Sequence, residues 1–169
     1  MTVAPRSLAE IDWATWTPQD DAVLLFVIRG GEALLIHKKR GLGAGKINAP
    51  GGRIEPGETP VAAAIRETRE EVSVTPSAPR WRGRLLFQFT DGYRLGCHVF
   101  TADGCEGTPA ESDEAAPFWA PLDALPFDAM WADDRLWIPW MLADRPFHGR
   151  FIFDGDRMVD HALVDADAR

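Results

Sequence analysis

The chain has 169 residues, which fits one domain, and its 46% hydrophobic and 26% charged residues exclude a disordered, collagenous or coiled-coil protein. Eighteen basic and 26 acidic residues give a net charge of −8, which disfavours long nucleic acid but not a small phosphate ligand that carries its own metal. The two cysteines, Cys97 and Cys105, form no metal or disulfide spacing, and no export signal or run of roughly 20 apolar residues occurs, so we expect a cytoplasmic protein with no membrane partner.

The first 21 residues are irregular in pattern and include Trp13 and Trp16. We therefore expect residues 1–21 to form an extension over the surface of the domain. Residues 22–169 are expected to form the domain itself.

The domain begins with two runs rich in strand-forming residues, 22–29 and 32–39, on either side of Gly30 and Gly31. A glycine pair favours the tight turn of a hairpin because both residues can adopt positive φ. The glycine-rich stretch 40–52 that follows has neither helical nor strand periodicity. It predicts a long loop, and such loops inside compact domains usually carry function.

A helix is predicted from Pro60 to about Val72. Thr59 can cap its N-terminus, and proline suits the first helical position because its missing N–H is not needed there. The residues spaced at the helical period on the expected buried face are Val61, Ala64, Ile65, Thr68 and Val72.

The rest of the chain alternates strand-like and helix-like segments. The predicted elements are strands at 81–89, 95–101 and 118–120, a helix over 133–142, and a closing hairpin around 154–155. Because hairpins and helices are interleaved, we expect one α+β domain with a mixed β-sheet flanked by helices.

Three carboxylates stand out on the first predicted helix. Glu67, Glu70 and Glu71 are spaced by three and four residues, so they are expected on one side of the helix, opposite the apolar face. A solvated helix face is the ordinary interpretation of such a pattern. Repulsion between Glu67 and Glu71 argues against it, although Arg66 and Arg69 can offset that repulsion.

The spacing around these carboxylates is more specific. Gly52 is followed after five residues by Glu58, after seven more by Arg66 and Glu67, and after two more by Glu70 and Glu71. This pattern resembles the Nudix box, and the chain is similar to the Nudix hydrolase family here. Two positions depart from the family pattern, Thr68 in place of a larger aliphatic residue and Ser73 in place of a glycine.

The resemblance implies an α/β/α sandwich with a mixed β-sheet between helices, and a Mg²⁺ cofactor with Mn²⁺ as the alternative ion. Hydrolysis of a pyrophosphate requires a hard cation with oxygen ligands. The expected metal-binding residues are Gly51, Glu67, Glu70, Glu71 and Glu114. Arg66 is expected to orient Glu58 through a bidentate pair, for which a plain surface salt bridge is the alternative.

Motifs outside the box narrow the resemblance to the family's MutT homologues that hydrolyse oxidised purine nucleoside triphosphates. The segments that carry it are 38–45, 97–100, 107–114, 125–137 and 147–153. This resemblance implies products of nucleoside monophosphate and pyrophosphate. It also implies a substrate-binding set of Lys38, Leu42, Asn48, Trp131, Asp133 and Asp134.

Three of these assignments have a plainer alternative. Trp131 can be an ordinary core residue, and Asp133 and Asp134 can cap the helix that follows them. Leu42 stands where the resemblance implies an aromatic residue. Among the glutamates, Glu67 is our first choice of general base and Glu114 the second.

We therefore expect a monomeric Mg²⁺-dependent enzyme that removes oxidised purine nucleotides, such as 8-oxo-dGTP and 2-hydroxy-dATP, from the precursor pool. Two alternatives remain at this point. One is a Nudix hydrolase of another nucleoside diphosphate derivative. The other is a catalytically silent nucleotide-binding module, which would have no need for a repulsive cluster of glutamates.

Overall fold

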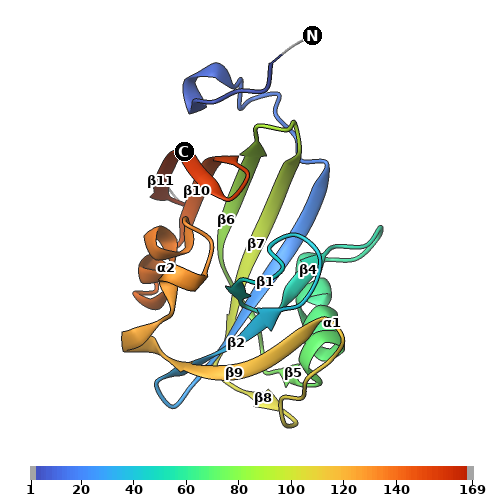
Figure 1. The fold of residues 1–169 in the computed structure, drawn as a ribbon. Coiled ribbons are helices and arrows are strands. Elements are labelled where there is room, and N and C mark those ends of the chain that lie inside the picture. Colours follow the sequence, from blue (N-terminus) through green and yellow to red (C-terminus); the bar gives the residue numbers. More distant parts are fainter. Residues whose placement is uncertain (1–2, 167–169) are drawn as a thin grey trace.

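A computed structural model describes residues 3–166 and contains a curved, mixed sheet with a helix on each face (Figure 1). The sheet has the strand order β11-β10-β6-β7-β1-β2-β3, with β4 paired to β1 and β9 paired to β2. Its strands are β1 (Asp20–Arg29), β2 (Glu32–Lys38), β3 (Ile47–Asn48), β4 (Gly51–Arg53), β6 (Arg80–Phe89), β7 (Arg94–Ala102), β9 (Ala115–Pro121), β10 (Phe147–Asp154) and β11 (Arg157–Asp165). A separate pair joins β5 (Thr75–Pro76) to β8 (Cys105–Glu106).

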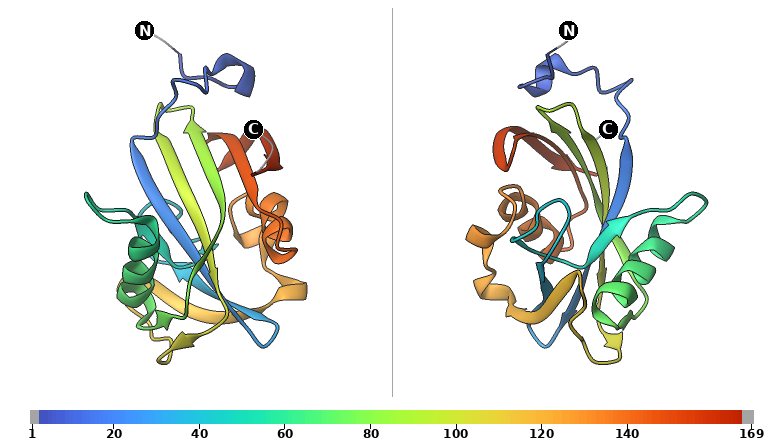
Figure 2. Two further views of the ribbon diagram at one scale, coloured as in Figure 1. Left: turned by 180° about the vertical axis from the view of Figure 1, so that it is seen from behind. Right: turned by 45° about the vertical axis from the view of Figure 1, so that its right-hand side comes forward.

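The sheet is mixed because β1 runs parallel to β7 and β10 runs parallel to β6, whereas its other pairings are antiparallel. The helix α1 (Pro60–Val72) lies on one face and α2 (Asp134–Leu142) on the other (Figure 2). Short 3-10 turns occur at Leu8–Glu10, Leu122–Ala124 and Phe127–Ala129. The predicted sandwich of helices around a mixed sheet is confirmed.

Alternation along the strands divides the apolar residues between two cores. The α1 side buries Val23, Leu25 and Val27 of β1, whereas Phe26 of β1 packs with Trp137 of α2 on the other side. Because successive side chains of a strand point to opposite faces, one strand supplies both cores.

Most of the predicted elements occur where the sequence placed them. The first hairpin turns at Gly30 and Gly31, whose φ values are 59° and 76°. Thr59 caps α1, because its side-chain oxygen accepts a hydrogen bond from the N–H of Ala62 at 3.3 Å.

Two expectations were wrong in detail. Residues 40–52 are not one loop, because β3 pairs with β2 and the start of β4 pairs with the middle of β1. Val61 is 38% exposed, and Glu71 takes a buried position on α1 instead. The buried face of α1 therefore differs from the predicted one: it includes the carboxylate of Glu71 and leaves out Val61.

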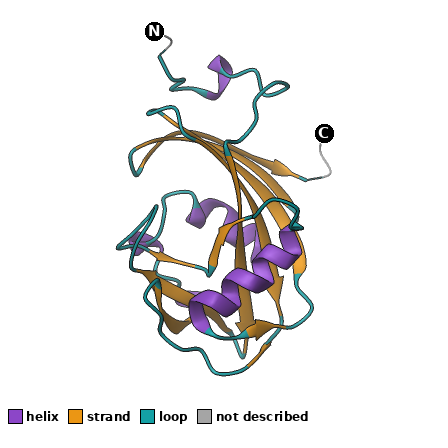
Figure 3. Ribbon diagram, turned by 90° about the vertical axis from the view of Figure 1, so that its right-hand side faces the viewer, coloured by secondary structure: helices purple, strands orange, loops and turns teal. Residues whose placement is uncertain are grey.

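The segment before β1 lies at one end of the sheet (Figure 3). Its 3-10 turn contacts β10 and β11, and Trp16 bonds to Gln88 of β6. The boundary expected after residue 21 falls within β1, which begins at Asp20, and the division into extension and domain stays a prediction. Among the described residues, no helix is long and apolar enough to span a membrane.

Candidate active site

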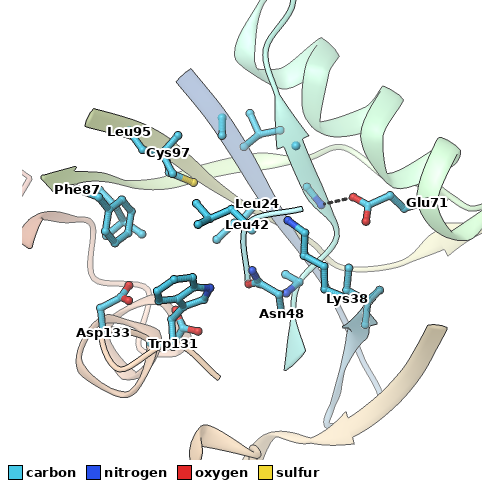
Figure 4. Close-up of a pocket in the computed structure, with 18 of the residues that line it drawn as sticks. Leu24, Lys38, Leu42, Asn48, Glu71, Phe87, Leu95, Cys97, Trp131 and Asp133 are labelled. Atoms are coloured by element: carbon cyan, nitrogen blue, oxygen red, sulfur yellow. Dashed lines mark hydrogen bonds between the residues drawn. The ribbon is translucent and has the colours of Figure 1, made fainter. Parts of the chain in front are cut away.

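A pocket opens between the middle of the sheet and the start of α2 (Figure 4). Its walls are mainly apolar side chains from β1, β6 and β7, with Trp131 at one side and Glu71 at the other. An outer cavity shares Lys38, Leu42 and Glu71 with this pocket and continues toward Glu114. The site therefore has an apolar inner end and a charged outer end.

Glu71 lies at the junction of the two ends. It is only 3% exposed, and its Oε1 accepts a hydrogen bond of 2.9 Å from the backbone N–H of Gly51. Burial, together with the negative charges of Glu67 and Glu114, raises the pKa of Glu71 to about 7, against the lowering effect of the Gly51 bond. The Gly51 N–H and the charge of Lys38 are therefore too weak to keep the pKa of Glu71 at its usual value.

Arg66 organises the other acidic groups of the box. Its Nε and Nη2 donate to the two carboxylate oxygens of Glu58 at 2.7 and 2.8 Å, which is the bidentate pair expected from the sequence. Its Nη1 donates to Glu67 at 2.9 Å and to Glu70 at 3.3 Å. The hydrogen bonds from Arg66, with that from the backbone of Glu55, lower the pKa of Glu58 to about 2, so Glu58 stays ionised.

Gly52 allows Glu67 to approach the sheet. A Cβ at Gly52 would lie 2.4 Å from the carboxyl carbon of Glu67, so no other residue fits without moving that glutamate. At Gly51 a Cβ would lie 2.0 Å from the carbonyl oxygen of Val23. Both glycines are therefore required by close packing of α1, β4 and β1.

The expectation that all three glutamates lie opposite the apolar face of α1 was wrong for Glu71, which is held against the sheet. The Glu67 side chain is 14% exposed and that of Glu70 is 59% exposed, whereas Glu71 is buried. In the part of the chain that the structure describes, no three His, Cys, Asp or Glu side chains form a ready ligand cluster. Arg66 engages Glu67 and Glu70, and Gly51 engages Glu71, so these groups are held apart.

The charges around the outer cavity nevertheless suit a divalent cation. Burial and the neighbouring Glu70 and Glu114 raise the pKa of Glu67, although Arg66 opposes that rise. Glu114 lines the outer cavity and pairs with Arg40 at 2.9 Å. A bound cation would offset the repulsion among these carboxylates, because positive charge favours their ionised forms.

The inner end carries two adjacent buried carboxyls, Asp133 and Asp134, which are 2% and 3% exposed. Asp133 Oδ2 accepts a hydrogen bond from Trp137 Nε1 at 2.8 Å, and its side chain makes no capping bond to α2. Within residues 3–166, Asp133 Oδ1 and Asp134 Oδ2 are buried oxygens without a hydrogen-bond partner. The capping alternative therefore fails for Asp133, and both residues line the pocket.

Burial dominates the titration of this pair. It raises the pKa of Asp133 to about 6, against the hydrogen bond from Trp137. It raises the pKa of Asp134 well above its usual range, and the charge of Asp133 adds to that rise while Lys46 opposes it. Two adjacent carboxyls in a dry site ionise one after the other, so one proton is retained between them over a wide pH range.

Trp131 is partly buried and borders the pocket, with Phe89 and Phe153 packed edge-on against it at centroid distances of 6.3 and 5.4 Å. The ammonium of Lys46 lies 5.2 Å from its ring centroid. A Cβ at Gly43 would lie 2.7 Å from Trp131 Nε1, so the loop before β3 presses directly on the indole. Trp131 therefore packs against the core on one side and lines the pocket as well.

The structure brings the other predicted binding residues to the same pocket. Lys38, Leu42 and Asn48 all line it, and Leu42 remains 47% exposed at its mouth (Figure 4). Further residues of the wall were not predicted from the sequence: Leu24, Leu85, Phe87, Phe89, Leu95 and Cys97. Strand alternation along β1, β6 and β7 places them on one face, but that pattern does not distinguish a pocket wall from a core.

Comparison with known proteins supports the same family. A model of the NUDIX domain matches residues 18–141. Oxidized purine nucleoside triphosphate hydrolase of Danio rerio is 45% identical over 146 residues, which cover 85% of this chain and 94% of the relative. The protein belongs to the Nudix hydrolase family. The Mus musculus protein of the same name is 38% identical over 147 residues, with coverage of 86% and 94%.

The family assignment extends to the fold. The MutT protein of Bacillus halodurans superposes with a TM-score of 0.77 at 26% identity, covering 85% of this chain and 97% of that one. Nudix hydrolases generally use a divalent metal.

Proposed function

We propose that this Nudix hydrolase cleaves oxidised purine nucleoside triphosphates, such as 8-oxo-dGTP and 2-hydroxy-dATP, to nucleoside monophosphate and pyrophosphate. The observation that carries the proposal is that Asp133 and Asp134, each with a buried and unpartnered oxygen among the described residues, line an apolar pocket next to the glutamates of the box. Relatives at 45% and 38% identity bear the name of that activity and support it.

The inner end is suited to a purine. Trp131 offers an aromatic surface for stacking, worth about 1–3 kcal/mol for a base. Asp133 and Asp134, with one proton between them, present an O–H donor beside a carboxylate acceptor. Because the shared proton can sit on either residue, the pair suits the donor and acceptor patterns of both oxidised guanine and oxidised adenine. Asn48 adds an amide at the same pocket.

The outer end is suited to the triphosphate. Lys38, Arg40 and Arg53 line it and can meet phosphate oxygens. Mg²⁺, with Mn²⁺ as the alternative ion, would be held by Glu67, Glu70, Glu71 and Glu114, with the backbone of Gly51 beside them. When bound, such a cation neutralises phosphate charge and activates water.

We assign the proton transfer to Glu67, with Glu114 as the second choice. Glu67 is mostly shielded from solvent, and Arg66 fixes its carboxylate at 2.9 Å. Arg66 is itself fixed by Glu58, so a chain of two ion pairs orients the proposed base. A general base must first lie within hydrogen-bond reach of the proton that it removes, and its pKa then sets how well it works.

Hydrolysis of 8-oxo-dGTP in ¹⁸O-water tests the reaction. Attack of water at the β-phosphorus places the label in pyrophosphate and leaves the monophosphate unlabelled. Label in the monophosphate, or release of orthophosphate and nucleoside diphosphate, would contradict the proposed cleavage.

A monomeric cytoplasmic enzyme completes the proposal. Both cysteines are free thiols in the structure, which suits a reducing compartment. Sedimentation of the purified protein checks the monomer.

A further inference from the structure

The segment before β1 is attached to the sheet by specific polar contacts. The Leu8 N–H donates to Asp160 of β11 at 2.8 Å, and Arg6 pairs with Asp154 at the end of β10 at 3.2 Å. Arg94, at the start of β7, donates from Nε to the carbonyl oxygen of Thr17 at 2.7 Å. Residues 5–19, which we name the N-terminal strap, therefore cross the sheet from β11 to β7.

Two tryptophans hold the strap, and they contact different parts of the sheet. The ring of Trp13 packs against that of Trp16 at 5.3 Å and lies under the guanidinium of Arg150 at 4.8 Å. Trp13 Nε1 donates within the strap, to the carbonyl oxygen of Leu8. Trp16 Nε1 instead donates to Gln88 Oε1 of β6 at 2.9 Å.

Gln88 is a buried amide, 4% exposed, at the end of β6. Its Nε2 donates to the carbonyl oxygen of Phe89 at 2.9 Å and lies 3.5 Å from that of Tyr93. The same turn is closed by the Phe89 N–H bonded to the Tyr93 carbonyl oxygen at 2.9 Å. Gln88 thus fastens the β6–β7 turn, and Trp16 satisfies the oxygen that would otherwise be buried without a partner.

This turn carries side chains that border the active site. Successive residues of a strand point to opposite faces, so Gln88 faces the strap while Phe89 faces the pocket. Phe89 lines the pocket and packs against Trp131, and Tyr93 lines the outer cavity. The Tyr93 hydroxyl also donates to Asp20 at 2.7 Å. A shift of the β6–β7 turn would therefore move Phe89 in the pocket and Tyr93 in the outer cavity together.

We infer that the N-terminal strap positions the nucleotide-binding pocket from the opposite face of the sheet, with Trp16 and Gln88 as the positioning residues. This inference rests on the proposed function for the identity of the nucleotide. Residues 5–17 lie before the region that matches the family model, residues 18–141. The Trp16–Gln88 hydrogen bond therefore joins a segment outside that region to a strand inside it.

Trp16→Phe tests the inference because it keeps the ring and removes the N–H donor. Trp13→Phe is the matched control, since its indole N–H donates only to Leu8 of the strap and its ring packs on Trp16 and Arg150, outside the β6–β7 turn. A buried amide oxygen left without a partner should raise KM for the oxidised nucleotide by about 3- to 10-fold in Trp16→Phe, with kcat within about twofold. Hydrogen exchange of the turn amides at 89–93 should rise by a similar factor or more.

Three results would overturn the inference. The first is an unchanged KM in Trp16→Phe, even if its melting temperature falls or the turn exchanges faster. The second is an equal rise of KM in Trp13→Phe. The third is unchanged exchange at residues 89–93. Failure of the proposed function is a separate result, because the exchange measurement needs no substrate and KM can be taken on whichever nucleotide the wild-type enzyme hydrolyses.

Discussion

At the scale of single residues, the carboxyl groups of the site differ in the direction of their pKa shifts. Glu58 is kept ionised by its two hydrogen bonds from Arg66. Asp133 and Asp134 are buried next to each other, so their pKa values are raised and the pair keeps a proton above the usual pKa of an aspartate. The proposed catalytic end therefore includes a firmly ionised carboxylate, whereas the proposed base-binding end retains a proton donor.

Replacing single glutamates tests the catalytic end. Glu67→Gln and Glu71→Gln should each lower kcat by at least about 100-fold, the effect of removing a general base or a metal-binding charge. Glu106→Gln, an exposed glutamate in β8, is the matched control and should retain wild-type kcat. Steady-state rates at saturating Mg²⁺ check this. A near-normal kcat in Glu71→Gln would remove it from the metal site.

Replacing the aspartates tests the base-binding end. Asp133→Asn or Asp134→Asn fixes one amide pattern and should narrow the range of purines hydrolysed, while the catalytic end is untouched. Trp131→Ala should instead weaken all purines alike, because stacking is tolerant of base identity. Values of kcat/KM over a panel of nucleotides distinguish the two effects. If neither asparagine variant changes the ranking of the panel, these residues do not read the base.

At the scale of elements, the sequence predicts what local rules control. The Thr59 cap and the glycine turn at residues 30 and 31 follow from local backbone preferences, and both are confirmed. The burial of Glu71 was not predictable in the same way. Helical periodicity predicts which residues of α1 share a face. It contains no information on the hydrogen bond from the Gly51 N–H, 20 residues away, that holds the Glu71 carboxylate against the sheet.

The departure at Ser73 has a structural consequence at the end of α1. Ser73 adopts the left-handed conformation, with φ of 65° and ψ of 23°, where the family pattern has glycine. The Cβ of serine destabilises this left-handed conformation, and glycine avoids that cost. The larger backbone entropy of glycine in the unfolded state offsets part of the gain. Ser73→Gly should therefore raise the free energy of unfolding by about 0.5–1 kcal/mol. Urea denaturation measures the change, and a destabilised variant would contradict it.

At the scale of the whole molecule, the pocket is assembled from segments far apart in the chain. Lys38 and Asn48 come from the first third, Phe87 and Cys97 from the middle, and Trp131 from the segment before α2 (Figure 4). The box and its neighbouring motifs were recognisable in the sequence. The aliphatic and aromatic wall was not, because only the sheet topology shows which alternating residues face a cavity.

The buried carboxyls predict how stability depends on pH without metal. Since folding raises the pKa of Asp133 to about 6 and that of Glu71 to about 7, their contribution is complete below about pH 4 and is lost as pH rises through these values. Burial also raises the pKa of Asp134, so its contribution falls with rising pH in the same direction. Between pH 5 and 8, the free energy of unfolding should therefore fall less in Asp134→Asn than in the wild type.

Comparison of two proteins at each pH isolates this effect. His98, whose pKa is lowered by burial, changes stability in the opposite direction in both proteins and cancels. Chemical denaturation at several pH values, in a chelator, supplies the data. Parallel pH profiles for wild type and Asp134→Asn would show that Asp134 is not protonated in the folded state.

The measurement that tests the central claim most directly is kcat/KM for 8-oxo-dGTP, 2-hydroxy-dATP, O6-methyl-dGTP, dGTP and dATP, side by side with Mg²⁺. One buried polar group left unpaired costs about 1–3 kcal/mol, so each oxidised nucleotide should exceed its undamaged parent by about 5- to 150-fold. Equal values for 8-oxo-dGTP and dGTP, or turnover of none of the triphosphates, would contradict the assignment of this site to oxidised purines.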